Sequence, residues 1–134
     1  MTYSKILIGC LILCLLGIAG CTSNTSTSSG FGSGSGYTIN LRATQTILPQ
    51  GGQTILIASV KDNQGNPVND STRGLIFTST QGATITAEEF INLGVCIATY
   101  TAPSSTSIPS AVVDQVTASY QGAFAYVSIE VFKQ

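Results

Sequence analysis

Apolar and polar residues alternate with a period of two through most of the chain from Tyr37 onward. Ile39, Leu41 and Ala43, for example, are each followed or preceded by a polar residue. Alternation of this kind is typical of strands that bury one face. The pattern predicts seven short strands, at about residues 38–43, 54–62, 75–80, 83–90, 95–102, 115–120 and 123–132. Of these, 83–90 is expected to be a short strand that leads into a loop.

Glycine- and proline-rich turns separate the expected strands. They include Pro49-Gln50-Gly51-Gly52, the cluster at residues 63–67, and Gln121-Gly122, which joins the last two strands as a hairpin. No segment shows a convincing helical period. Many short strands with turns in about 100 residues predict an all-β fold, an immunoglobulin-like antiparallel sandwich of two sheets. The Cys…Trp…Cys core of antibody domains is absent, so this sandwich is expected to lack a disulfide.

Charge is scarce in this chain. Only 8% of its residues are charged and its net charge is −1, whereas about 25% is usual in globular proteins. Nucleic-acid binding needs a basic face, which a few scattered cations do not provide. The chain has no histidine and therefore lacks the usual proton shuttle and the imidazole metal ligand. Catalysis is therefore disfavoured.

The N-terminal segment has the composition of an export signal. Lys5 precedes an apolar run of 13 residues, Ile6 to Ile18, which is shorter than the about 20 residues that span a bilayer. Its end, Ile18-Ala19-Gly20-Cys21, resembles the lipobox of bacterial lipoproteins. The resemblance implies that residues 1–20 are cleaved and that Cys21 becomes a lipid-bearing N-terminus, which anchors the chain to a membrane. The alternative is an ordinary secretory signal with a cysteine nearby by chance.

Residues 21–36 contain the acylated cysteine and a stretch rich in serine, threonine and glycine. Such a composition is typical of a flexible linker, so the folded domain is expected at residues 37–134. Thr22 follows the cysteine, and no aspartate stands there to favour retention at the inner membrane. By analogy with lipoprotein sorting, we expect an anchor in the outer membrane, with the domain facing the periplasm or the surface.

The four cysteines divide by position. Cys10 and Cys14 lie in the apolar run, and Cys21 is the expected lipid site. Cys96 is then the single cysteine of the folded part, so no internal disulfide can form. We expect it to be buried, because unpaired cysteine behaves as a small apolar residue; a reactive thiol is the alternative.

Three segments together resemble a bacterial Ig-like domain of the intimin/invasin (Big-1) type. They are Ile39–Ala43 before the Pro-Gln-Gly-Gly turn, Ala58–Val68 with its Asp-x-x-Gly-Asn-Pro-Val element, and Gly94–Pro103. The resemblance implies an Ig-like fold and an adhesive or spacer role at the cell surface. Adhesins of this family carry such domains in tandem beneath a distal binding domain, whereas one copy is present here.

Two acidic groups are candidates for chemistry, and each has a simpler interpretation. The oxygen-rich stretch that could supply Ca²⁺ ligands consists of Asp62, Asn63, Asn66, Asn69 and Asp70. It lacks the spacing of an EF-hand, and ordinary turn capping accounts for it. Glu88 and Glu89 are adjacent and point to opposite faces of an extended chain, so they cannot act as an acid–base pair. No cofactor and no metal is expected, other than the lipid on Cys21.

Large apolar residues occupy some positions expected to face solvent. Ile55 and Ile57 oppose the inward register of the strand at 54–62, as Phe124 and Tyr126 oppose that of the last strand. They form one contact patch only if the two strands share a sheet or an edge. The alternative is ordinary surface, since scattered exposed apolar residues are common.

The sequence therefore favours a non-enzymatic module anchored to the cell envelope by lipid, which binds a protein or a glycan. The alternative is a self-assembling structural subunit, in which the same residues or an open sheet edge join copies. An enzyme or a metal protein is the third hypothesis.

Overall fold

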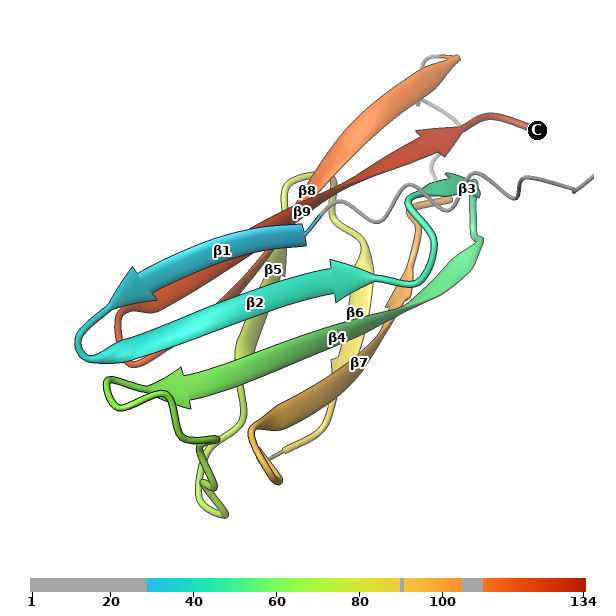
Figure 1. The fold of residues 1–134 in the computed structure, drawn as a ribbon. Helices are drawn as coiled ribbons and strands as arrows, with labels where there is room; N and C mark the ends of the chain where they lie inside the picture. The colour runs from blue at the N-terminus through green and yellow to red at the C-terminus, as the bar shows by residue number, and fades with distance from the viewer. Residues whose placement is uncertain (1–28, 90, 105–109) are drawn as a thin grey trace, which may run out of the picture.

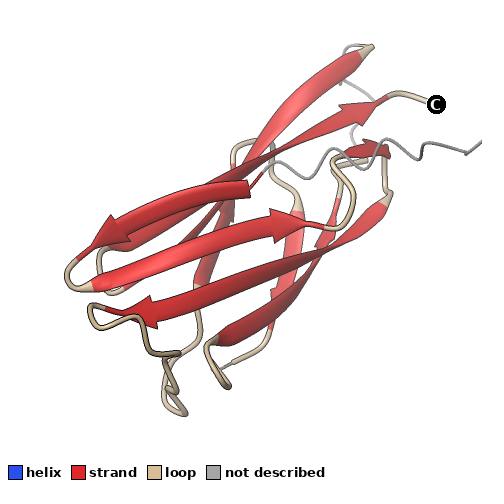
Figure 2. Cartoon of the chain, in the orientation of Figure 1, coloured by secondary structure: helices blue, strands red, loops and turns tan. Residues whose placement is uncertain are grey.

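The computed structural model describes residues 29–89, 91–104 and 110–134, and these form a sandwich of strands without a helix (Figures 1 and 2). The strands are β1 (Ser29–Gly34), β2 (Tyr37–Ala43), β3 (Ile47–Pro49), β4 (Gln53–Asp62), β5 (Ile76–Ser79), β6 (Thr84–Ala87), β7 (Val95–Thr101), β8 (Ala111–Tyr120) and β9 (Ala123–Phe132). They make a five-stranded sheet in the order β1-β2-β4-β7-β6 and a four-stranded sheet in the order β3-β9-β8-β5.

The strand order is that of an immunoglobulin constant-type domain. Strands β2, β4, β7 and β6 take the places of A, B, E and D, and β5, β8 and β9 take those of C, F and G. All pairs are antiparallel except β3 with β9. The predicted all-β, disulfide-free sandwich is confirmed, with one parallel pair and two strands, β1 and β3, that the alternation did not show.

The core lies between the sheets and follows the predicted alternation. Every second residue of β9, from Ala123 to Val131, is buried, and the residues between them are exposed. The inward positions of β2 and β4 are likewise buried, among them Leu41 and Leu56. Tyr37 and Tyr120 close one end of the core edge to face, with ring centroids 5.1 Å apart. The period of two therefore fixes which residues face the core.

Strand β1 corrects the predicted boundary between linker and domain. Residues 29–34 were expected in the flexible linker, but they pair with β2 along their whole length, and Ser35 and Gly36 form the turn between the two strands. Folded structure therefore begins eight residues before the expected start at Tyr37.

Glycines explain why a Ser/Gly sequence forms this strand. Gly30, Gly32 and Gly34 face the backbone of β9, and a Cβ at Gly32 would stand 1.2 Å from the carbonyl oxygen of Phe124. No side chain fits in that space, so the two backbones approach closely only because of the glycines. Strand β1 thus lies against β9 and closes one side of the sandwich (Figure 1).

Strands β1 and β3 share the edge of β9. Gly34 lies near Gly122 and Gly30 near Tyr126, so β1 runs antiparallel to β9 over its first half. Strand β3 pairs with residues 130–132 at the other end. An exposed sheet edge can pair with a strand of another chain. The edge of β9 is covered by β1 along its first half and by β3 at its other end.

A buried carboxylate holds the opposite side of the sandwich. Asp114 on β8 has no exposed surface. Its oxygens accept hydrogen bonds from the hydroxyls of Ser79 (2.7 Å), Thr80 (3.1 Å) and Tyr100 (2.8 Å) and from the backbone N–H groups of Thr80 (2.9 Å) and Gln81 (3.1 Å). Tyr100 belongs to the other sheet, so these bonds connect both sheets to the turn after β5. Burial, and then the hydrogen bond and charge of Asp114, raise the pKa of Tyr100.

The glycine contact predicts an unusual sign for Gly32→Ala. Glycine to alanine in an ordinary strand is stabilising by about 0.5–1 kcal/mol, but here the added methyl collides with the Phe124 carbonyl. We expect a loss of about 1–3 kcal/mol, as in overpacked cores, with faster proteolysis in β1. Urea unfolding measures the change, and Ser33→Ala, at an exposed position of the same strand, is the control. Equal or greater stability of Gly32→Ala would contradict the contact.

The Asp114 site predicts the effect of Tyr100→Phe. The change removes one donor from a buried carboxylate, and a hydrogen bond to a charged group contributes about 1.5–3 kcal/mol. Tyr126→Phe removes the hydroxyl of an exposed tyrosine and is expected to change stability by less than about 0.5 kcal/mol. Comparison of the two variants by urea unfolding tests the assignment. Similar losses in both would show that Asp114 does not depend on Tyr100.

Candidate interaction surface

The structure does not bring the four predicted patch residues together. Ile55 and Ile57 lie on β4, in the five-stranded sheet, and Phe124 and Tyr126 lie on β9, in the four-stranded sheet. All four point away from the core, but the outer faces of two packed sheets look in opposite directions. The predicted patch is therefore two separate surfaces.

The outer face of the four-stranded sheet carries most of the exposed large apolar residues. Of the nine in the described part of the chain, six lie on this face: Ile47, Ile76, Val113, Phe124, Tyr126 and Phe132. Phe124 is 56% exposed and Ile76 is 68% exposed. Glu130 is the one charged residue among the outward positions of β5, β8 and β9. Such a concentration of exposed apolar groups is typical of a contact surface.

Large and small side chains are segregated on this face. The outward residues of β9 are mostly large, and their partners on β8 are mostly small: Phe124 stands beside Ser119, Tyr126 beside Thr117, and Phe132 beside Ala111. The result is a ridge along β9, formed by Phe124, Tyr126 and Phe132, and a groove along β8, formed by Ser119, Thr117 and Ala111. Val113 beside Glu130 and Gln115 beside Ser128 are the exceptions, so the ridge and the groove are interrupted in the middle of the two strands.

The outer face of the five-stranded sheet is less apolar. Ile55, Ile57 and Ile97 form a small cluster there, since Ile57 and Ile97 are direct cross-strand partners. Arg42 stands beside Ile57 in the same row, and threonines flank the cluster on β6 and β7. Sequence alternation identified Ile55 and Ile57 correctly as outward but did not reveal Ile97.

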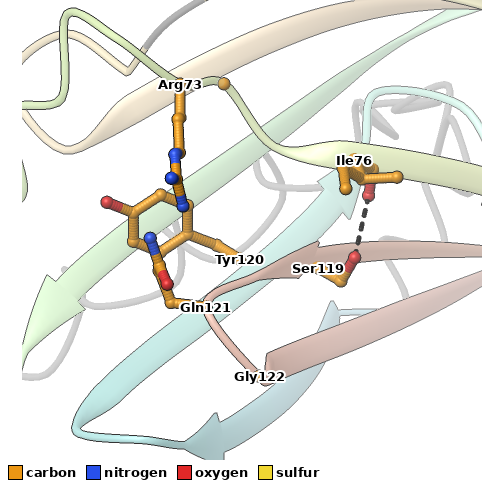
Figure 3. A pocket seen from close by; sticks show the side chains of 7 residues that line it. Arg73, Ile76, Ser119, Tyr120, Gln121 and Gly122 are labelled. Carbon is orange, nitrogen blue, oxygen red and sulfur yellow. Dashed lines mark hydrogen bonds between the residues drawn. The ribbon is translucent and has the colours of Figure 1, made fainter.

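A shallow pocket adjoins the ridge and groove at the end where β8 turns into β9. It is lined by Arg73, Gly74, Ile76, Ser119, Tyr120, Gln121 and Gly122 (Figure 3). Arg73 and Gln121 extend toward the Tyr120 ring, and the Ser119 hydroxyl donates a hydrogen bond to the carbonyl of Ile76 (3.4 Å). The lining offers one cation and an amide to a ligand, but no carboxylate, thiol or imidazole.

Asp70 fixes the loop that forms one wall of this pocket. Its carboxylate accepts hydrogen bonds from the backbone N–H groups of Thr72 (2.9 Å) and Arg73 (3.1 Å) and from the hydroxyls of Thr72 and Tyr120, each at 2.7 Å. The bonds from Thr72 and Tyr120 lower the pKa of Asp70 to about 2. Burial and the same Asp70 contact raise the pKa of Tyr120 to about 12. The hydrogen bonds of Asp70 with Tyr120 and with the backbone of Arg73 therefore hold Arg73 beside the pocket.

Two other residues of the oxygen-rich stretch also accept hydrogen bonds from backbone N–H groups. Asp62 accepts from the N–H groups of Gln64 (2.9 Å) and Asn66 (2.8 Å), and the Asn69 side chain accepts from the N–H of Leu93. The Asp62 contacts are turn capping, whereas the Asn69 contact joins two loops that are 24 residues apart in the chain. Among the described residues, no three His, Cys, Asp or Glu side chains lie together as a possible metal site.

Cys96 is fully buried, as predicted, and its thiol lies 3.8 Å from the carbonyl oxygen of Glu88. Burial is the main cause that raises the pKa of this thiol. Cys21 and the lipobox residues Ile18, Ala19 and Gly20 lie outside the described residues. Within the described part, no helix has the length and hydropathy needed to cross a membrane.

Comparison with known proteins gives limited similarity. No family model matches the chain, and no curated protein matches it in sequence. Among solved structures, the crystal structure of domains 4 and 5 of the S-layer protein SbsC is similar, with a TM-score of 0.41 and 14% identity over 80% of this chain. The chain spans about half of that structure (51%). The resemblance to Big-1 domains therefore rests on the quoted segments alone.

The low pKa of Asp70 predicts a pH dependence. The folded state keeps this carboxylate charged to about pH 2, whereas in the unfolded chain it protonates near 3.8. The unfolded state therefore binds more protons in this interval, and the contribution of Asp70 to stability is present above about pH 4 and lost toward about pH 2. Asp70→Asn should lower Tm at neutral pH, and the difference from wild type should shrink on acidification. Thermal unfolding at several pH values measures this; a constant difference would contradict it.

Proposed function

We propose that this chain is a lipid-anchored, non-enzymatic interaction module of a bacterial cell envelope, which displays its Ig-like domain to bind another protein or a surface glycan. The observation that carries the binding role is the outer face of the four-stranded sheet. Exposed aromatic residues and few charges distinguish the centres of protein interfaces from ordinary surface, and Phe124 and Tyr126 provide such a centre.

The anchor is supported by the resemblance of residues 18–21 to a lipobox, and the start of β1 at Ser29 sets the length of its tether. Seven residues lie between Cys21 and Ser29, and the eight Cα-to-Cα steps of this segment reach at most about 28 Å. A tether of this length keeps the domain near the lipid surface. In a two-membrane bacterium we propose the outer membrane, because no aspartate follows Cys21.

A self-assembling structural subunit is the second candidate. The segregation of large residues on β9 and small residues on β8 favours it, because a surface with both a ridge and a groove can pack against its own copy. For the pocket beside Tyr120 we propose no catalytic role, since its lining residues supply no general base.

Replacement of Cys21 tests the anchor. In cells, wild-type protein is expected in the membrane fraction, with a mature N-terminal peptide whose mass includes the acyl chains. Cys21→Ser should abolish the acylated peptide and leave the precursor unprocessed, because the lipid is attached to the cysteine sulfur. Cys96→Ala is the control and should retain the lipid. An unmodified wild-type peptide released into the periplasm or medium would contradict the proposal.

A further inference from the structure

We infer that the partner of the outer face of the four-stranded sheet is a second copy of this chain, packed face to face about a two-fold axis that runs along the β8–β9 hairpin. This inference rests on the second candidate function, self-assembly, and names the partner of the same surface. It follows from the order of side-chain sizes on two neighbouring strands.

The groove along β8 has a wall on each side at one end. Ile76 on β5 and Phe124 on β9 stand on either side of Ser119, because the three are cross-strand neighbours in one row. In the next outward row, Thr78 and Tyr126 flank Thr117. A large side chain from outside would therefore contact apolar groups on both sides and a small residue beneath it.

A two-fold axis between β8 and β9, parallel to the strands, supplies such side chains. The rotation places β9 of one copy over β8 of the other, so each outward residue meets the cross-strand partner of its own position. Phe124 then lies over Ser119 of the second copy, Tyr126 over Thr117, and Phe132 over Ala111. In the middle row, Gln115 of each copy lies over Ser128 of the other. The large residues of each copy therefore lie over small residues of the other in these four rows, and the interface is isologous, as in most dimers.

Charge does not oppose this arrangement. The outward positions of β5, β8 and β9 carry only Glu130, and the rotation places it over Val113 of the second copy, not over the second Glu130. The aromatic rings and hydroxyl groups of each copy then contact a surface that carries almost no charge. Of the outward residues, Glu130 opposes association most, because its carboxylate loses hydration when the second copy covers it.

The area is near the lower limit of a specific interface. Ten-residue strands with a rise of about 3.4 Å and a spacing of about 4.8 Å give β8 and β9 a face of about 34 by 10 Å. When β3 and β5 are included, the faces of the two copies together have an area of about 900 Å². This is slightly below the area of about 1,000 Å² that specific interfaces exceed. We therefore expect weak association in dilute solution and strong association where tethers hold copies on one membrane, which raises their effective concentration.

The position of β1 makes this geometry compatible with two anchors. Strand β1 runs antiparallel to β9, and its first residues lie beside the middle of β9, with the N-terminal end of β1 directed toward the end of the sandwich where β9 finishes. An axis parallel to the strands directs the N-terminal ends of β1 in both copies the same way. Two copies related by this axis can therefore both be anchored in one membrane.

Photo-cross-linking of the full-length chain in cells tests the inference. The photoreactive amino acid benzoylphenylalanine replaces Tyr126 in one copy of the chain, and a second copy with a different affinity tag and the native Tyr126 is made in the same cells. We expect a product of twice the monomer mass that carries both tags, with the cross-link in the β8 peptide around Thr117. The probe at Ile97, on the other sheet, is the control and should give no such product.

Two substitutions at matched positions distinguish loss of the interface from misfolding of the domain. Thr117 and Thr99 are both half-buried threonines on the outer faces of central strands. Thr117→Arg fills the groove with a charge and should reduce the dimer product at least about tenfold, while Thr99→Arg leaves it unchanged. Glu130→Gln should increase the product, because it removes the charge that the interface desolvates.

Other outcomes overturn the inference. A discrete product with a different protein, and no dimer, would show that the face binds another partner; the proposed function would stand and the second copy would be rejected. A dimer that forms equally from Ile97, or that survives Thr117→Arg, would also reject this interface. No product of any kind from Tyr126 would reject both the second copy and the binding role of the face.

Discussion

The fold depends first on how two sheets with little charge and no disulfide are held in one arrangement. Asp114 does this on one side: its fully buried carboxylate on β8 accepts one hydrogen bond from β7 and four from the end of β5 and the turn after it. A buried charge is tolerated only where it is fully hydrogen-bonded. The residues that donate to Asp114 are therefore as necessary to the fold as the carboxylate itself. On the other side, the close approach of β1 to β9 closes the sandwich through glycine. Between these two sides the apolar core fills the space.

Alternation along the sequence predicted the sandwich because each long strand buries every second residue, and β9 does so without exception. It did not predict β1, because a strand whose inward residues are glycines has no apolar signal; the regular spacing of Gly30, Gly32 and Gly34 was the only indication. Strand β3 is three residues long and has no period. Asp114 appeared as one polar residue among many, since its partners come from distant parts of the chain.

The candidate surface was predictable in part for the same reason. Alternation gives the side of a strand to which a residue points, so Phe124 and Tyr126 were identified as outward. It does not give the sheet to which the strand belongs, so Ile55 and Ile57 were joined with them although they lie on the opposite face. The ridge and groove depend on the register of β8 against β9 and on the pairing of β5 with β8, which only the folded structure shows.

The measurement that tests this account most directly is methyl NMR of the full-length protein in lipid nanodiscs that hold one or two copies. Ile76 and Val113 lie on the outer face of the four-stranded sheet, and Ile55 and Ile97 lie on that of the five-stranded sheet. If copies pack through the ridge and groove, the methyl signals of Ile76 and Val113 shift or broaden in discs with two copies, and those of Ile55 and Ile97 do not. Changes confined to Ile55 and Ile97, or identical spectra in both kinds of disc, would contradict it.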